Sequence, residues 1–382
     1  MRELALEEVF PRVAEIVADV RARGDEALLD WSERLDGERP SALRVPFDEL
    51  DGAQLDEASL RAIRKMAESV AAFHSPQRPS DISVTTLPGV VAERRFRPLD
   101  SVGIYVPGGR APLASSLVMT AVPARIAGVR RIAVATPRPH RAVLATAREL
   151  GLDEVYAVGG AQAIAALAYG TESIPSVDKI VGPGNRWVTA AKLLVSSRVA
   201  IDLPAGPSEV LVVADESADP AHCAADLLAQ AEHGPDSEAI LVTTSGRLAG
   251  QVAGLVDGRA RIEVVPSVEE GIARANAYAP EHLELLVADP EAAAALVTSA
   301  GTVCLGPFAP AVLGDYAAGV NHVLPTGGLA RGAGGLGLEA FLKPVQFLRA
   351  TPEGLAGARE TIATLAGLEG LPLHAAAVAA RP

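Results

Sequence analysis

Hydrophobic positions recur with a helical period in the first part of the chain. Between residues 4 and 35 they fall at Leu4, Val9, Val13, Ile16, Val17, Val20, Leu28 and Trp31. This spacing predicts an amphipathic helix that is interrupted near Pro11 and Gly24, because neither residue suits a helix interior. A second helix is predicted from Glu57 to Phe73.

From about residue 100 the pattern changes to short runs of β-branched residues. These runs cover residues 102–106, 131–136, 154–158, 179–181, 199–203, 209–214, 239–243, 262–265, 283–288 and 302–305. Stretches rich in Ala and Leu with helical spacing, such as 142–150 and 162–168, lie between several of them. Strands that alternate with helices predict parallel βαβ units. The turn at residues 204–209 divides the runs into two series and indicates a cleft, and we expect ligands at the carboxyl ends of the strands.

The predicted fold is α/β, with two Rossmann-like doubly wound domains and helical extensions at both termini. We expect a helical segment and the start of the first domain in residues 1–100, and nucleotide-binding turns in 101–208. Residues 209–330 complete that domain, and residues 331–382 form a lid loop and a C-terminal helical arm. The lid contains a GxGxxG string that follows no strand, so it is not a dinucleotide fingerprint. The arm holds one further helical stretch, Pro352 to Leu368.

Composition narrows the class of protein. The formal charge of −13 and the lack of a dense basic run argue against a nucleic-acid or anionic membrane surface. The two cysteines, Cys223 and Cys304, form no CxxC pair, which is typical of a reducing cytoplasm. No apolar run approaches the roughly 20 residues that a transmembrane helix requires. We therefore expect a cytoplasmic protein.

Glycine-rich turns follow three of the predicted strands. They are Val106-Pro-Gly-Gly109, Val158-Gly-Gly-Ala-Gln162 and Val181-Gly-Pro-Gly-Asn185. Each turn lets a phosphate or ribose approach the backbone closely. One such turn alone is an ordinary strand-to-helix connection, but three at successive strand ends favour a nucleotide groove.

Polar residues capable of chemistry fall in five places. They are Ser208-Glu209, Gln230 with His233, Glu281-His282, Asp315 with His322, and Glu369 with His374. Gln230 and His233 lie one turn apart at the end of a helix that Asp219 and Pro220 begin, so both face one side. The remaining histidines, His74, His140 and His222, are interpreted as structural.

His233, Asp315 and His374 are plausible zinc ligands, with Gln230 an unusual fourth, although sequence spacing alone cannot bring them together. Adjacent residues face apart in a strand and about 100° apart in a helix. Glu281 and His282 therefore reach one pocket only from a turn, and Ala279-Pro280 before them permits one.

Several strings resemble histidinol dehydrogenase, in order, from about residue 90 to the end. They are Tyr105-Val-Pro-Gly-Gly109, Gly159-Gly-Ala-Gln162, Gly182-Pro-Gly-Asn185, Ala205-Gly-Pro-Ser-Glu209, Gln230-Ala-Glu-His233, Ala279-Pro-Glu-His-Leu-Glu284, the run from Gly314 to Thr326, and Leu365 to His374. The resemblance implies an NAD-dependent, four-electron oxidation of L-histidinol through L-histidinal to L-histidine. It also implies one zinc per subunit, NAD as cofactor, and a homodimer whose C-terminal arm completes the partner's site.

The resemblance also assigns roles to residues. Glu281 and His282 correspond to the catalytic acid/base groups, and Tyr105, Gln162 and Asn185 to the cofactor contacts. The zinc ligands correspond to Gln230, His233, Asp315 and His374. These four residues also bind substrate, together with Ser208, His282, His322 and Glu369.

The sequence departs from the family pattern at Pro310-Ala311, where a Pro-Glu pair is usual. One alternative is therefore a related zinc- and NAD-dependent dehydrogenase of another small polyol, such as a sulfonated propanediol. A metal-binding or nucleotide-binding protein without catalysis is a further alternative. The retained Glu281-His282 pair and the complete set of zinc ligands favour the first interpretation.

Overall fold

The computed structural model describes residues 6–108, 112–204 and 206–381. Leu4, Gly109 and Ala205, which belong to patterns named above, lie outside the described residues. The chain divides into two compact units: Met1–Gln77 with Leu99–Phe341, and Arg78–Pro98 with Leu342–Pro382. No helix among the described residues is long and apolar enough to cross a membrane.

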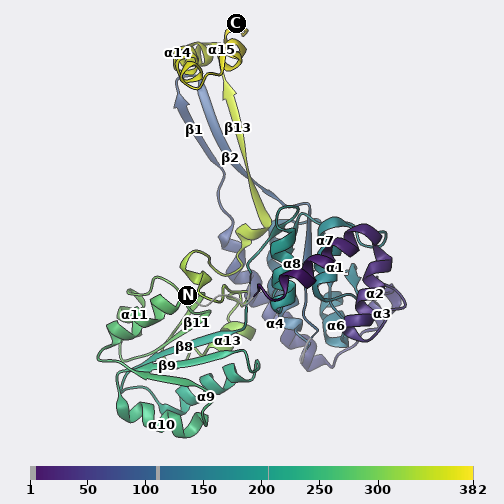
Figure 1. Cartoon of the computed structure of the whole chain (residues 1–382). Coiled ribbons are helices and arrows are strands. Elements are labelled where there is room, and N and C mark those ends of the chain that lie inside the picture. The colour runs from purple at the N-terminus through teal and green to yellow at the C-terminus, as the bar shows by residue number, and fades with distance from the viewer. Residues whose placement is uncertain (1–5, 109–111, 205, 382) are drawn as a thin grey trace. The chain divides into compact units, whose positions relative to one another are not determined.

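The first unit contains a five-stranded sheet with the order β5-β4-β3-β6-β7. Its strands are β3 (Ser101–Tyr105), β4 (Arg131–Ala135), β5 (Val155–Tyr156), β6 (Lys179–Val181) and β7 (Ala200–Ile201). The connecting helices are α5 (Ala114–Ala127), α6 (Arg141–Glu149), α7 (Gly160–Tyr169) and α8 (Arg186–Val195). Three of the helices that connect its strands, α6, α7 and α8, are labelled in Figure 1. All four strand pairs are parallel. Since the order reverses at β3, this sheet is doubly wound.

A second parallel sheet in the same unit has the order β10-β9-β8-β11-β12. Its strands are β8 (Glu209–Ala214), β9 (Glu238–Thr243), β10 (Arg261–Val264), β11 (His282–Leu286) and β12 (Thr302–Leu305). Its helices are α9 (Pro220–Ala231), α10 (Gly246–Val256), α11 (Val268–Tyr278), α12 (Pro290–Ala294) and α13 (Ala311–Tyr316). Val212 and Leu211 of β8 belong to separate hydrophobic clusters, one on each face. Both faces are therefore covered, which explains why β8 reads as a continuous apolar run.

Two parallel α/β sheets confirm the predicted fold class. The domain limits at residues 100, 208 and 330 stay a prediction. The predicted lid segment includes the 3₁₀ helices η2 (Leu329–Arg331) and η3 (Leu338–Phe341). Leu336 and Leu338 are buried, so opening the segment as a lid would expose both side chains. Lid motion also stays a prediction.

Four helices precede the first sheet of this unit. They are α1 (Phe10–Arg23), α2 (Asp25–Asp36), α3 (Phe47–Gly52) and α4 (Glu57–His74). Gly24 separates α1 from α2 with φ 58°, as expected from its position between the two apolar stretches. An interruption near Pro11 is wrong, because Pro11 lies in the first turn of α1, where no backbone N–H is required.

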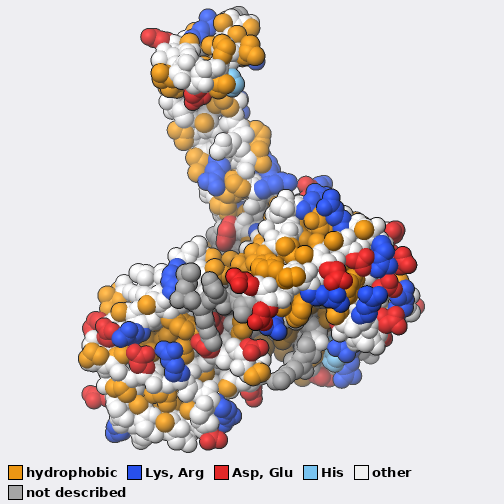
Figure 2. Space-filling view, in the orientation of Figure 1, with side chains coloured by type: hydrophobic (Ala, Val, Ile, Leu, Met, Phe, Trp, Pro, Cys, Tyr) orange, Lys and Arg blue, Asp and Glu red, His pale blue; other side chains and the backbone are white. Residues whose placement is uncertain are grey.

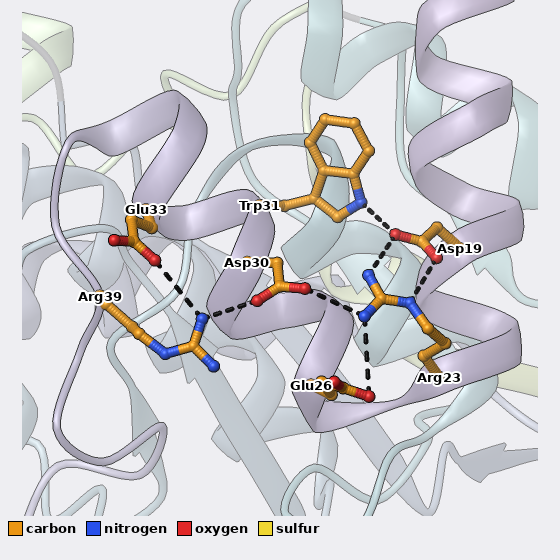
Figure 3. A network of polar contacts seen from close by, with 7 residues as sticks. All are labelled: Asp19, Arg23, Glu26, Asp30, Trp31, Glu33 and Arg39. Atoms are coloured by element: carbon orange, nitrogen blue, oxygen red, sulfur yellow. Dashed lines mark hydrogen bonds and ion pairs between the residues drawn. The ribbon is translucent and has the colours of Figure 1, made fainter.

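A polar network joins α1 to α2 around the buried ring of Trp31 (Figure 3). The Arg23 guanidinium donates to both oxygens of Asp19 at 2.8 Å and to Asp30 at 3.0 Å. Trp31 Nε1 donates to Asp19 Oδ2 at 2.8 Å, and Arg39 extends the network by donating to Asp30 at 2.7 Å. The network therefore fixes the angle between the two helices that the Gly24 turn permits.

The second unit contains a three-stranded antiparallel sheet that the sequence analysis did not predict. The strands β1 (Ile82–Leu87), β2 (Val90–Pro98) and β13 (Leu342–Ala350) have the order β1-β2-β13. Every residue of β1 is exposed, and β2 has no fully buried residue. Because neither face of this sheet is a core, the alternation that marks a half-buried strand is absent.

The second unit ends in two helices, α14 (Pro352–Leu368) and α15 (Pro372–Ala379). The expectation of one helix is wrong, because Pro372 begins a second one after Gly370, whose φ is 68°. Apolar side chains lie open on this unit (Figure 2). Leu368 and Leu373 are each 80% exposed.

A buried ion pair holds the turn after β6. Lys192 of α8 pairs with Asp202 after β7, and the two side chains are 2% and 1% exposed. Lys192 Nζ also donates to the Gly182 carbonyl at 3.0 Å, and the Gly182 amide donates to Asp202 Oδ2 at 2.7 Å. The pair therefore hydrogen-bonds both the carbonyl oxygen and the amide of Gly182.

We predict that Lys192→Met lowers the free energy of unfolding by about 3–5 kcal/mol, because Asp202 is left buried without its partner. Urea denaturation followed by circular dichroism measures the change. The double variant Lys192→Met/Asp202→Leu should recover much of the loss, since no unpaired charge remains.

The matched control is Arg130→Met, which breaks the exposed Arg130–Asp100 pair, whose side chains are 80% and 58% exposed. Exposed pairs contribute about 0–1 kcal/mol. Equal destabilisation by Lys192→Met and Arg130→Met would contradict the assigned role of the buried pair.

Candidate functional site

The candidate cofactor contacts lie at the carboxyl ends of the first sheet. Tyr105 is the last residue of β3, Gln162 lies in the first turn of α7, and Asn185 precedes α8. Asn185 Oδ1 accepts from the amides of Trp187 at 3.0 Å and Val188 at 3.2 Å, and so caps that helix. The amino termini of α7 and α8 therefore open toward the same edge, where their dipoles favour an anion.

Buried polar atoms lie at the carboxyl ends of the strands of the first sheet. The Tyr105 hydroxyl accepts from the Gly160 amide at 3.1 Å, and burial raises the pKa of Tyr105 to about 12. Gln162 is fully buried, and among the described residues its Oε1 has no hydrogen-bond partner. An unsatisfied buried acceptor is costly, so this oxygen is suited to a donor on a ligand.

Gly182 allows the neighbouring turn to approach β3. Its φ is 115°, and a Cβ atom there would lie 2.2 Å from the Tyr105 carbonyl oxygen. Only glycine fits such a position, both for its backbone angle and for the contact. The turn from Gly182 to Asn185 therefore depends on glycine and on the buried Lys192–Asp202 pair described above.

The candidate acid/base residues lie at the amino ends of the strands of the second sheet, not at the carboxyl ends. Glu209 begins β8 and His282 begins β11, with Ser208 and Glu281 directly before them. These are amino ends of parallel strands, whereas the sequence analysis expected carboxyl ends. The physical reason is that the polar side chains lie in the turns before β8 and β11 and on the first residue of each strand.

Glu281 joins the two strands at this edge. Ala279 adopts a left-handed conformation with φ 56° at the end of α11 and turns the chain before Pro280. The Glu281 carboxylate then accepts from Ser208 Oγ at 2.8 Å and from the Glu209 amide at 2.9 Å through its Oε2 atom. Burial raises the pKa of Glu281, against the opposing effect of His282 and these two donors.

His282 lies between two carboxylates. Its Nδ1 is 3.8 Å from Glu281 Oε2, and its Nε2 is 3.6 Å from Asp315 Oδ1. Burial disfavours the imidazolium, yet the neighbouring carboxylates of Asp315 and Glu281 outweigh burial and raise the pKa of His282. The turn at Ala279-Pro280 thus brings Glu281 and His282 into one site, as the sequence analysis required.

Asp315 and His322 form the far side of this cluster. His322 Nδ1 lies 3.1 Å from the Asp315 carbonyl oxygen and 4.0 Å from its Oδ1. Burial lowers the pKa of His322, so the ring is neutral. Since a carbonyl only accepts, Nδ1 carries the proton, and Nε2 accepts from the Ser116 hydroxyl 3.3 Å away. Burial opposes ionisation of Asp315, but the neighbouring His282 is the main opposing group and the pKa of Asp315 is lowered.

Gln230 and His233 border the same cluster from the end of α9. Gln230 is buried, its Oε1 is 3.4 Å from Ser208 Oγ, and its Nε2 has no hydrogen-bond partner among the described residues. His233 is exposed, and its Nδ1 lies 3.2 Å from the Gln230 carbonyl. With the proton on Nδ1, the Nε2 lone pair is available to a metal.

A pocket of about 790 Å³ connects the two edges within the first unit. Its lining includes Asn185 and Trp187 beside the first sheet, and Ser208, Glu209 and His233 beside the second. The volume falls in the range of small-molecule and cofactor sites. The cofactor candidate Asn185 and the substrate candidates Ser208 and His233 therefore share one pocket.

The remaining candidates lie in the second unit. Glu369 follows α14 and His374 lies in α15, and both are exposed. Among the described residues, no group of three His, Cys, Asp or Glu side chains is arranged to hold a metal. In the first unit, only His233 and Asp315 of the proposed ligands belong to these four residue types, since Gln230 is an amide.

Sequence reasoning missed several residues of the site. Ser116, which contacts His322, lies in the apolar helix α5 and gave no signal. Glu284 lies two residues after His282 on the same face of β11, and its Oε1 accepts from the Ala311 amide at 2.7 Å. Burial and the neighbouring Asp226 raise the pKa of Glu284 to about 8. The alternation His282, Glu284 could have indicated it, because a carboxylate within an apolar strand is unusual.

Comparison with known proteins agrees with this geometry. The family model described as histidinol dehydrogenase matches residues 1–382. A histidinol dehydrogenase from Mycobacterium bovis is 45% identical over 408 residues, covering 98% of this chain and 92% of the relative. One from Vibrio parahaemolyticus is 44% identical over 391 residues, covering 97% and 91%. The crystal structure of histidinol dehydrogenase from Elizabethkingia anophelis has a TM-score of 0.92 at 39% identity, covering 97% of this chain and 91% of that one. The chain belongs to the histidinol dehydrogenase family, and is an oxidoreductase.

Proposed function

We propose that this enzyme oxidises L-histidinol through L-histidinal to L-histidine, the last steps of histidine biosynthesis, with NAD as acceptor and zinc orienting the substrate. The observation that carries the proposal is the buried cluster of Glu281, His282 and Asp315, which Ser208, a residue of the lining of a cofactor-sized pocket, contacts through its bond to Glu281. Acid/base groups with displaced pKa values beside a pocket are typical of active sites.

The donor set fits zinc. His233 offers Nε2, Asp315 is an ionised carboxylate, and the Gln230 amide is buried with an unpaired nitrogen. Histidine and carboxylate are common zinc ligands, and we propose that His374 completes the set with Gln230. Zinc, when bound, acts as a template that holds the substrate's amine and imidazole.

The edge of the first sheet fits NAD. Gln162 Oε1 is a buried acceptor without a partner among the described residues, and the turn at Gly182 brings bare backbone to the edge. We propose Tyr105, Gln162 and Asn185 as cofactor contacts. NAD, when bound, accepts the hydride that the substrate carbon loses.

The residues of the cluster supply the proton transfers. In the first oxidation the substrate carbon loses a hydride and its hydroxyl loses a proton, which His282 accepts as general base. The carboxylates of Glu281 and Asp315 stabilise the imidazolium that results. In the second oxidation water adds to the aldehyde, and Glu281 removes a proton from that water. The hydrated carbon then loses its hydride to a second NAD, which leaves the carboxylic acid. Burial raises the pKa of Glu281, which makes it a stronger base than an exposed carboxylate.

The other candidates position the substrate. We propose that Ser208 and His322 hold it from the first unit, while Glu369 binds it from the second. His322 is neutral because burial lowers its pKa, so it can hydrogen-bond to the substrate without adding charge. Gln230, His233, His282, Asp315 and His374 also contact the substrate in this proposal.

We further propose a homodimer in which the C-terminal arm completes the partner's site. The second unit exposes Leu348, Leu368 and Leu373 by 74%, 80% and 80%. Exposed apolar patches of this kind mark interaction surfaces, and a two-fold dimer pairs them symmetrically. Cys223 and Cys304 are free and buried, which suits the reducing cytoplasm that we propose as the location.

The test of the function separates the two half-reactions. Wild-type enzyme should convert both L-histidinol and L-histidinal to L-histidine, identified by mass spectrometry. Glu281→Gln keeps the side-chain shape but cannot accept a proton, so it should slow aldehyde oxidation about 10²-fold and alcohol oxidation much less. His282→Asn should slow both. Glu291→Gln, on the exposed helix α12, serves as the control and should leave both rates unchanged. Equal loss of rate in both half-reactions for Glu281→Gln would contradict the assignment of Glu281 to aldehyde oxidation.

Metal removal gives a second expected outcome. Dialysis against a chelator should abolish turnover, and added zinc should restore it at one ion per subunit by elemental analysis. His233→Ala should lower the zinc content, whereas His222→Ala, at the start of the helix α9 that ends just before His233, should not. Full activity in protein that contains no metal would rule out the template role.

Complementation tests the shared site. Mixing His374→Ala subunits with His282→Ala subunits should restore about a quarter of wild-type activity after random exchange, because half the dimers then contain one intact site of two. Each variant alone should be inactive. A mixture that demonstrably exchanges subunits and still has no activity would exclude an arm that crosses to the partner.

A further inference from the structure

A carboxylate that the proposed function does not use lies at the cofactor edge. Asp36 is the last residue of α2, and its Oδ2 accepts from Gln162 Nε2 at 3.4 Å. The neighbouring strands β3, β4 and β5 all end at this edge. Tyr105 ends β3, and the charge of Asp36 contributes, after burial, to the raised pKa of Tyr105. Asp36 therefore lies beside two of the three proposed cofactor contacts, although it comes from a distant part of the chain.

Arg138 lies in the turn after β4, and its positive charge acts on Asp36. Arg138 is exposed and has a left-handed backbone with φ 45°, an unusual conformation for a residue with a Cβ atom. Asp36 is half-buried, and burial raises its pKa while the positive charge of Arg138 acts in the opposite direction. The edge thus has one half-buried carboxylate and, within range of its charge, one exposed guanidinium.

In doubly wound sheets an acidic residue at this edge binds the ribose 2′-hydroxyl of NAD, and a nearby arginine accommodates the 2′-phosphate of NADP. The acidic residue ordinarily follows the second strand. Here the residues after β4 are Thr136-Pro-Arg-Pro-His140, with no acid among them. Asp36 supplies a carboxylate to the same edge from α2.

We propose that Asp36 accepts a hydrogen bond from the adenosine ribose 2′-hydroxyl and thereby selects NAD over NADP. This inference rests on the proposed function, since it assumes that a nicotinamide dinucleotide binds at Tyr105, Gln162 and Asn185. A 2′-phosphate carries about −1.5 to −2 charges, so it is repelled by the Asp36 carboxylate. Arg138 is then the residue that takes the phosphate once the carboxylate is removed.

The test is direct binding of NAD and NADP by isothermal titration calorimetry, together with thermal unfolding. Asp36→Asn can still accept from Gln162, so its melting temperature should match that of wild type. Its dissociation constant for NAD should rise about tenfold, because the acceptor of the ribose hydrogen bond loses its charge. Its affinity for NADP should rise, so the preference for NAD falls or reverses. Adding Arg138→Ala to this variant should remove the gain in NADP affinity.

Glu33→Gln, one turn earlier on α2 and exposed, is the matched control and should change neither affinity. The inference is overturned if Asp36→Asn leaves both dissociation constants unchanged. Equal weakening of NAD and NADP overturns it too, because Asp36 would then only anchor α2 against α7. Wild-type protein that binds neither nucleotide would overturn the cofactor assignment in the proposed function as well. This result distinguishes a failure of that assignment from a failure of the Asp36 inference alone.

Discussion

The rest of the site depends on the two hydrogen bonds that the Glu281 carboxylate accepts. The carboxylate accepts from Ser208 Oγ and from the Glu209 amide, and so ties the start of β11 to the start of β8. Because the group is buried, losing these donors would leave it unsatisfied at a cost of about 1–3 kcal/mol or more. The two bonds also fix the residue directly before His282, whose Nε2 lies 3.6 Å from Asp315 Oδ1.

The two sheets contribute opposite edges to one pocket. The first sheet offers its carboxyl ends, where glycine turns and helix amino termini suit a nucleotide, and the second offers its amino ends, where turns before the strands carry acid/base groups. Charge is distributed accordingly. Buried carboxylates cluster around His282. At the nucleotide edge the buried polar side chains, Tyr105 and Gln162, are neutral, and the charged Asp36 and Arg138 are half-buried and exposed, respectively.

Much of the fold could be predicted from sequence because its strands are buried on both faces and read as apolar runs. β8 was predicted at its observed limits, and α14 likewise. The sheet β1-β2-β13 could not be predicted, since its strands have no buried face to impose alternation. At the site, sequence indicated Glu281 and His282 through the turn at Ala279-Pro280. It could not indicate Ser116 or Asp36, whose neighbours come from distant parts of the chain.

The central claim is that one site carries out two successive oxidations of a single substrate. The most direct measurement is the number of NADH molecules formed per L-histidinol consumed, with the substrate limiting and NAD in excess. The account predicts two, with L-histidine as the product. One NADH per substrate, with L-histidinal accumulating, would contradict it, because the acid/base pair would then serve only an alcohol dehydrogenase.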